Sequence, residues 1–271
     1  MEVHHHPHVE KKNFKEYFLE FLMIFLAVTM GFFAESYREH LVDIKKEKEY
    51  ITQLAGDLKE DMKECGINNI LSVTSFDKNF ANYCDTLVDL LSKHDPSRAE
   101  IIYAYYSYNR ITIDWMTPYF KDATYSQLRN NGGFSDIRDQ NIIRDINEYY
   151  KWVNIVNDYR DEIKERYTAI IYNEGRKVFD QRLEKVMLDS INNKGFPFTF
   201  QPADSITQYI SSSTPIQFAQ HDAETILKLC NDLLSYENLL KASIRMIKSQ
   251  GKRAQDLVEE IEKEYDVKNK N

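Results

Sequence analysis

The chain has 271 residues, of which 42% are apolar and 29% charged, and its formal net charge is −8. This length and apolar content suffice for a membrane anchor and one globular domain, and exclude a wholly disordered chain. The acidic balance argues against nucleic-acid binding, which needs a basic surface. Because there are only 8 Gly and 6 Pro, and strand-type alternation is scarce, the composition predicts an all-α fold.

Residues 1–16 form a short tail that begins with a histidine cluster. Its members are His4, His5, His6 and His8. Imidazole is a common ligand of transition metals, so metal binding is one reading of the cluster. Nothing in so short a segment around Pro7 would fix a coordination geometry, and we expect no bound metal or cofactor.

Residues 17–37 contain the stretch that is apolar enough for a bilayer. YFLEFLMIFLAVTMGFFA, at 17–34, carries a single charge, Glu20. As a helix it would be ~27 Å long, close to a hydrocarbon core of about 30 Å. It is longer than the apolar region of a signal peptide, and no small-residue cleavage site follows it. We therefore expect one uncleaved, single-pass transmembrane helix.

One face of this predicted helix collects its small residues and both flanking acids. At 100° per residue, that face carries Glu20, Ile24, Ala27, Gly31, Ala34 and Glu35, and we call it the anchor face. Most of the phenylalanines lie on the opposite side. Small residues four apart let a second helix approach closely, which predicts a helix–helix interface. The alternative is that Glu20 reaches the headgroups and the small residues share a face by chance.

The lysine and arginine counts on the two sides of the span are nearly balanced. Lys11, Lys12 and Lys15 precede it, whereas Arg38 and three lysines between 45 and 48 follow it. A long following domain can cross the membrane largely regardless of its charge. Since the lysines closest to the span lie on the short tail, we expect a cytoplasmic N-terminus and an extracytoplasmic domain of residues 38–271.

The pattern of apolar residues at three- and four-residue steps predicts long helices throughout this domain. We expect helices over 38–92, continuous with the anchor, over 136–190, and from the Thr214-Pro215 pair to near Tyr265. A helix starting near Pro96 and a short one closed by Gly132-Gly133 lie between them, and 194–205 reads as a connector. Such helices bury their apolar stripes most economically in an antiparallel bundle.

An aromatic cluster lies between 103 and 115. It comprises Tyr103, Tyr105, Tyr106, Tyr108 and Trp115. Spaced in this way on a helix, the tyrosines are expected to line contacts inside the bundle, with their hydroxyls at its rim. The alternative is a ligand surface for a sugar or a peptide.

No motif of a known catalytic class is present, since the sequence lacks phosphate-binding loops, metalloprotease helices and nucleophile elbows. Acid pairs at Asp57/Asp61 and Glu60/Glu64 could bind a cation, but a solvated helix face explains them more simply. The cysteines are Cys65, Cys84 and Cys230. Cys65 and Cys84 on one helix would be ~28 Å apart and could not pair unless the helix breaks near Gly66. We therefore expect buried free thiols, with a Cys84–Cys230 disulfide as the alternative.

Three stretches carry a family resemblance. They are KKNFKEYFLEFLMIFLAVTMGFFAESYREH at 11–40, EKEYITQLAGDLKED at 47–61 and ATYSQLRNNGGFSDIRDQNIIRDINEYY at 123–150. With them the chain resembles an uncharacterised family of single-pass membrane proteins common in Bacteroidota, over most of residues 4–152. The resemblance implies a bacterial inner-membrane setting and a helical periplasmic domain, and it implies no activity.

Two functions of different classes follow. The favoured one is a non-enzymatic accessory or scaffold subunit of an envelope complex, whose anchor docks in the lipid on another integral membrane protein or on a second copy. The other is an envelope sensor that binds a ligand at the aromatic cluster. A buried pocket lined by Tyr105, Tyr108 and Trp115 would favour the sensor, and a filled core there would favour the scaffold.

Overall fold

The computed structural model describes residues 13–66, 72–113, 117–192, 207–208 and 210–265, and all regular structure in these residues is helical. The elements are α1 (Phe14–Glu64), α2 (Val73–Leu91), α3 (Arg98–Ile113), α4 (Ala123–Asn130), the 3-10 turn η1 (Gly133–Asp136), α5 (Gln140–Ile163), the π-helical turn η2 (Lys164–Thr168), α6 (Ala169–Val178), α7 (Gln181–Asn192) and α9 (Ala223–Tyr265). The all-α prediction is therefore confirmed.

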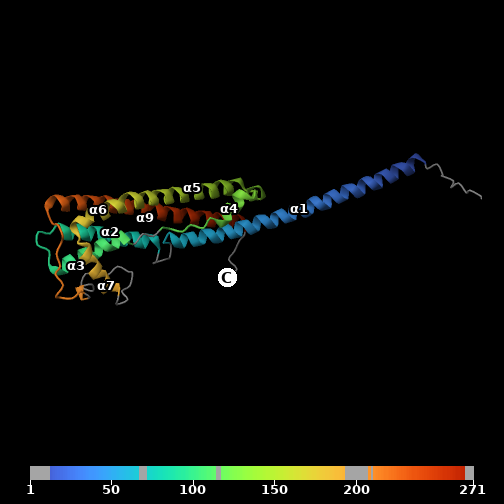
Figure 1. The fold of residues 1–271 in the computed structure, drawn as a ribbon. Coiled ribbons are helices and arrows are strands. Elements are labelled where there is room, and N and C mark those ends of the chain that lie inside the picture. Colours follow the sequence, from blue (N-terminus) through green and yellow to red (C-terminus); the bar gives the residue numbers. More distant parts are fainter. Residues whose placement is uncertain (1–12, 67–71, 114–116, 193–206, 209, 266–271) are drawn as a thin grey trace, which may run out of the picture.

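Helix α1 runs without interruption from the predicted anchor into the bundle. Asn13 and Glu16 form a capping box at its start, and the Asn13 amide donates to Glu16 Oε2 at 3.1 Å. Its 51 residues make a helix of ~76 Å. The first part projects away from the other helices, and the second part packs among them (Figure 1). The expected continuity of anchor and bundle is thus confirmed.

The prediction of one helix over 38–92 is wrong, because α1 ends at Glu64 and α2 begins only at Val73. Gly66 has a φ of 88°, in the left-handed region that favours glycine. A Cβ at this position would lie 2.4 Å from Thr74 Oγ1 and 2.8 Å from Ser72 Oγ. Gly66 thus permits both the turn and the close approach of the next helix.

The prediction of one helix over 136–190 is also wrong. Asp139 caps α5 by accepting from the Asn141 and Ile142 amides, and the helix passes through η2 into α6. It ends at Val178, because the fully buried Phe179 is extended, with φ −103° and ψ 122°. The connector predicted at 194–205 lies outside the described residues.

The long helices form three columns, and contacts at successive levels along the bundle give their relative directions. Glu47 contacts Arg138 and Tyr265, Asp61 contacts Tyr149, and Asp77 contacts Arg160 and Ser243. Along this series the residue numbers rise from 47 to 77 in α1 and α2 and from 138 to 160 in and just before α5, whereas they fall from 265 to 243 in α9. The column of α1 and α2 therefore runs parallel to that of α5 and α6, and α9 runs antiparallel against both (Figure 1).

The core has two apolar clusters along the bundle. The one nearer the anchor is built on residues such as Ile51, Leu54, Ile146 and Ile261. The other is built on α2, α3 and the N-terminal half of α9. Cys65, Cys84 and Cys230 are buried and free, as expected, and no Cys84–Cys230 disulfide forms.

Candidate functional site

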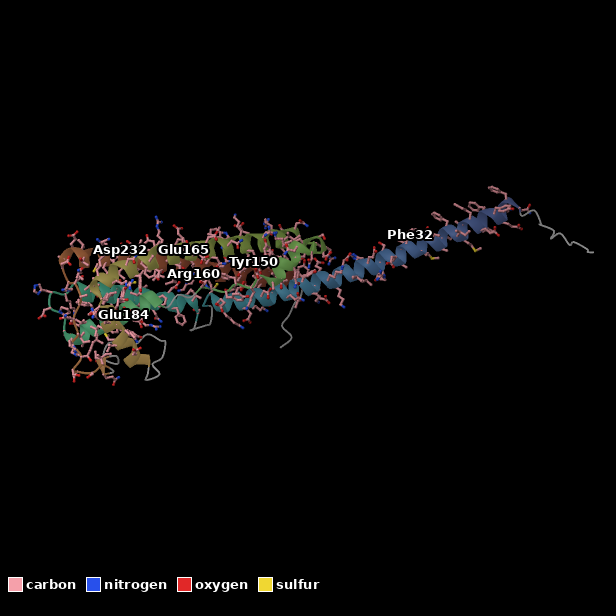
Figure 2. The ribbon with its side chains drawn as sticks, in the orientation of Figure 1. Phe32, Tyr150, Arg160, Glu165, Glu184 and Asp232 are labelled. Atoms are coloured by element: carbon pink, nitrogen blue, oxygen red, sulfur yellow. The ribbon has the colours of Figure 1, made fainter. Side chains whose placement is uncertain are left out.

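The anchor segment of α1 contacts no other helix of the described structure. An 18-residue window of α1 near the N-terminus has a mean hydropathy of 2.0, and none of it is buried, so this helix is long and apolar enough to cross a membrane. Large side chains such as Phe25, Phe32 and Phe33 are more than half exposed. Figure 2 shows Phe32 on the part of α1 that projects away from the bundle. Burying so much apolar surface requires lipid or a partner helix.

The anchor face keeps the geometry that the sequence predicts. Because α1 is continuous through Glu20, Ile24, Ala27, Gly31, Ala34 and Glu35, their spacing places them on one side of the helix. A Cβ built on Gly31 would meet nothing within 4 Å, so this side is open to a neighbour. At its end Glu35 accepts from Arg38 Nε at 3.0 Å. The middle of the anchor face therefore carries apolar, mostly small side chains, and the Glu35–Arg38 ion pair lies at one end of it.

A second candidate region is the junction where α1 enters the bundle. Three carboxylates of α1 bind the segment 117–139, which we call the strap. Glu47, 2% exposed, accepts from the Arg138 amide and Nε, both at 2.8 Å, and from the Tyr265 hydroxyl at 2.7 Å. Asp57 Oδ2 accepts from the Thr124 hydroxyl at 2.6 Å.

Asp61 is the innermost of these carboxylates and is fully buried. Its oxygens accept from the Lys121 amide and from the Tyr149 hydroxyl, both at 2.7 Å. Burial raises the pKa of Asp61 to about 7, although both hydrogen bonds oppose the rise. The prediction that these acids lie on a solvated helix face is therefore wrong for Asp61. The described residues contain no cluster of His, Cys, Asp or Glu that could hold a metal.

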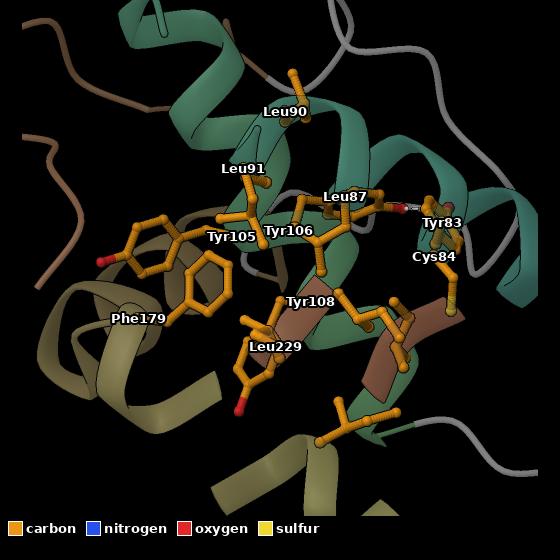
Figure 3. Packing of buried hydrophobic residues seen from close by; sticks show 14 of the residues in the cluster. Tyr83, Cys84, Leu87, Leu90, Leu91, Tyr105, Tyr106, Tyr108, Phe179 and Leu229 are labelled. Atoms are coloured by element: carbon orange, nitrogen blue, oxygen red, sulfur yellow. Dashed lines mark hydrogen bonds between the residues drawn. The ribbon is translucent and has the colours of Figure 1, made fainter. Parts of the chain in front are cut away.

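The tyrosines of α3 lie in the core rather than on a surface. Tyr103, Tyr105, Tyr106 and Tyr108 are each at most 6% exposed. Figure 3 shows Tyr105, Tyr106 and Tyr108 among the packed residues of the core. The Tyr108 ring stacks on Phe179 with centroids 4.4 Å apart, and its hydroxyl donates to the Tyr172 carbonyl at 3.2 Å. These four residues form no ligand surface, which corrects the alternative reading of the cluster. Trp115 lies outside the described residues, as does the His4–His8 cluster.

The packing around Tyr108 and Tyr105 is tight. A Cβ on Gly175 of α6 would lie 2.1 Å from the Tyr108 ring. The Tyr105 hydroxyl donates to the Gln217 carbonyl at 3.0 Å and accepts from the Asp180 amide at 2.9 Å. The region is a filled aromatic core whose polar atoms bind the backbone.

One buried interaction was not predicted from the sequence. Arg160 of α5 is fully buried and its Nη1 lies 2.5 Å from Asp77 Oδ2 in α2 and 2.7 Å from the Ser243 hydroxyl in α9. Burial raises the pKa of Asp77, while the guanidinium and the hydroxyl oppose this. A polar residue within the apolar stripes of α2 and α5 is the signal that could have revealed it.

Comparison with known proteins adds no relative, since neither protein-family models, curated proteins nor solved structures match this chain. The geometry of the anchor face, the strap and the filled core therefore carries the functional argument.

Proposed function

We propose that this protein is a non-enzymatic, membrane-anchored scaffold or accessory subunit of an inner-membrane or envelope complex. One observation carries the proposal: a single helix, α1, is both the apolar segment and a wall of the bundle core. A partner bound to the anchor face is thus joined to the bundle by continuous helix, with no flexible linker between them.

The residues between the apolar segment and the bundle set the distance of the bundle from the bilayer. Glu47 is the first fully enclosed residue of α1, ten positions after the end of the predicted span at 37. Ten helical residues cover ~15 Å, which is about twice the ~5–8 Å that the headgroup region adds on one side of a bilayer. The bundle would stand just beyond the headgroups and could contact a partner's extramembrane domain.

The interior of the bundle favours a scaffold over the sensor that binds at the aromatic cluster. The four tyrosines of α3 that such a sensor would use are buried, and Tyr108 packs against both Phe179 and Gly175. Buried ionisable groups such as Asp61 and Asp77 are held by hydrogen bonds between helices. These are the interactions of a rigid structural domain.

We further propose a cytoplasmic N-terminus and a periplasmic bundle. The lysines nearest the span lie on the tail, and the resemblance to bacterial inner-membrane proteins supports the same arrangement. Labelling of intact cells with an impermeant thiol reagent should modify a cysteine at exposed position 182 and spare one at position 15. The reverse pattern would contradict this orientation.

Docking is tested by comparing two matched anchor variants. Gly31→Leu places a bulky side chain on the anchor face, whereas Phe25→Leu changes the opposite face. We expect Gly31→Leu, at normal expression and insertion, to lose the partners or self-association retained by wild type and Phe25→Leu in gentle detergent. If both variants keep the same associations, the anchor is only a tether.

A further inference from the structure

The outer side of α1 along the bundle continues the anchor face. The α1 residues buried in the bundle include Glu47, Leu54 and Leu58. At about 100° per residue, they lie within about 20° of the line directly opposite the middle of the anchor face. Because α1 is continuous, the side that the bundle leaves uncovered is the anchor-face side extended beyond the predicted span (Figure 1). We call this side of α1 from Arg38 to Lys63 the stalk face.

Both glycines of α1 lie on this continuous surface. Gly31 and Gly56 are 25 positions apart, about seven helical turns, so they face the same way and are separated by ~37 Å along the helix. A Cβ on either glycine would meet nothing within 4 Å. A glycine inside a helix destabilises it relative to alanine, and nothing in the described structure occupies the space beside these two. That space lets a second helix approach closely at two levels.

Two apolar side chains lie on the stalk face just beyond the predicted span. Leu41 is 49% exposed and Val42 is 40% exposed. Relative to the middle of the face, Leu41 lies about 60° to one side and Val42 about 40° to the other. A second helix packed along the middle of the face would cover both.

The charged residues of the stalk face are sorted between its two edges. Glu49 and Glu60 lie on one side of the midline, and Lys45, Lys59 and Lys63 lie on the other. Lys59 pairs with α9, whereas the other four side chains are more than half exposed. These four form pairs within α1, at 3.8 Å for Lys45–Glu49 and 2.6 Å for Lys63–Glu60. Exposed pairs of this kind contribute little to stability, so they can rearrange when a partner binds.

We propose that the partner of the anchor face is a second copy of this chain, and that the two α1 helices pack in parallel along the anchor face and the stalk face. The inference rests on the proposed docking function and names its partner. Two copies inserted in the same orientation are related by a two-fold axis parallel to their helices. This axis places the acidic edge of each stalk face against the lysine edge of the other.

The same symmetry matches the uncharged residues of the two copies. Leu41 of one copy lies beside Val42 of the other, and Gly31 and Gly56 of both copies meet at the midline at the same two levels. Arg38 is also near the midline, where Glu35 of its own helix neutralises it by accepting from its Nε at 3.0 Å. The buried side of each α1 points away from the axis, so the two bundles lie outside the central helix pair.

Disulfide crosslinking between two differently tagged copies in native membranes tests the proposal. Gly31→Cys and Gly56→Cys place single thiols at the midline, in a chain whose native cysteines are changed to alanine. Asp43→Cys is the control, because this exposed position of α1 lies about 140° from the midline. After mild oxidation we expect a product of dimer mass that carries both tags at positions 31 and 56, in yields at least fivefold above the control.

A charge exchange tests the pairing of the edges. In the Gly56→Cys background, Lys45→Glu sets acid against acid across the two copies and should lower the yield at least threefold. Adding Glu49→Lys exchanges the two edges at this level and should restore the yield. Failure of the exchange to restore it would overturn the proposed packing.

The outcomes at the two glycines separate this inference from the docking function. No two-tag product at Gly56→Cys, or a yield equal to that of Asp43→Cys, would overturn the inference. A product at Gly31→Cys that contains a different protein would also overturn it, while leaving the docking of the anchor intact. No product with any protein at Gly31→Cys would contradict the docking function as well.

Discussion

Tyr265 and Glu47 lie 218 positions apart in the sequence, yet the Tyr265 hydroxyl donates to Glu47 Oε1 at 2.7 Å. The same carboxylate accepts two hydrogen bonds from Arg138. One side chain thus joins α1, the strap and the end of α9 where α1 enters the bundle. Burial raises the pKa of Glu47, but the hydrogen bonds from Arg138 and Tyr265 outweigh it and lower the pKa overall.

Glu47→Gln should destabilise the bundle by about 1–3 kcal/mol, since buried partners lose a charged acceptor. Tyr265→Phe should cost about 1 kcal/mol. Denaturant unfolding of the two single variants and the double variant measures the coupling between the residues. Additive losses would show that the two side chains act independently and would contradict the proposed coupling of α1 to the end of α9 through Glu47.

Asp61 gives a pH dependence of a definite sign. Because the folded state raises its pKa from 3.8 to about 7, the folded protein binds this proton more tightly than the unfolded chain does. The contribution of Asp61 to stability is therefore greatest at low pH and falls as pH rises from about 4 to 7. Glu47 has the opposite sign, since its lowered pKa gives stability that is lost on acidification.

Asp61→Asn removes the titrating carboxyl group and replaces it with a side chain of similar size. Between pH 5 and pH 8 the unfolding free energy of wild type should fall by about 2–3 kcal/mol relative to that of the variant. Parallel urea titrations at the two pH values measure the difference. A constant gap between the proteins would mean that Asp61 does not titrate in this range.

The Arg160–Asp77 pair predicts a strong asymmetry between single and double substitutions. Asp77→Asn leaves a buried guanidinium without its counter-charge and should cost about 3–5 kcal/mol. Arg160→Met combined with Asp77→Leu removes both charges and should recover most of that loss. Thermal melting compares the three proteins, and a double variant no more stable than Asp77→Asn would contradict this account.

Gly175 and Gly56 offer a matched test of the filled core. A Cβ at Gly175 would strike the Tyr108 ring, so Gly175→Ala should destabilise by about 1–3 kcal/mol. A Cβ at helical Gly56 meets nothing within 4 Å, so Gly56→Ala should stabilise by up to about 1 kcal/mol. Equal effects of the two substitutions in denaturant unfolding would mean that a Cβ fits beside Tyr108, which would contradict the tight packing described for Gly175.

The sequence predicts the helices and the anchor well because both depend on local patterns. Apolar residues at helical spacing indicate α1, α5 and α9, and hydropathy alone indicates the apolar segment. The breaks at Gly66 and Phe179 were missed because the periodicity continues across them. At Gly66 the approach of Ser72 and Thr74 decides the conformation, and at Phe179 the aromatic contacts to Tyr105 and Tyr108 do.

The candidate sites likewise divide into one that local sequence spacing predicts and others that depend on contacts between distant residues. The anchor face follows from spacing on one helix, and the structure keeps that geometry. Asp61 reads as a solvated acid because its partners, Lys121 and Tyr149, lie 60 and 88 positions away. Arg160 and Asp77 are 83 positions apart, so their pairing likewise depends on how the helices assemble.

The central claim, that the anchor face docks a partner helix, is tested most directly by cysteine crosslinking in native membranes. Single cysteines replace Ile24, Ala27, Gly31 and Ala34 on the face and Phe21, Phe25 and Phe32 away from it, with Cys65, Cys84 and Cys230 changed to Ala. The account predicts crosslinked products at the first four positions and little at the other three. Uniform crosslinking, or crosslinking strongest at the phenylalanine positions, would contradict it.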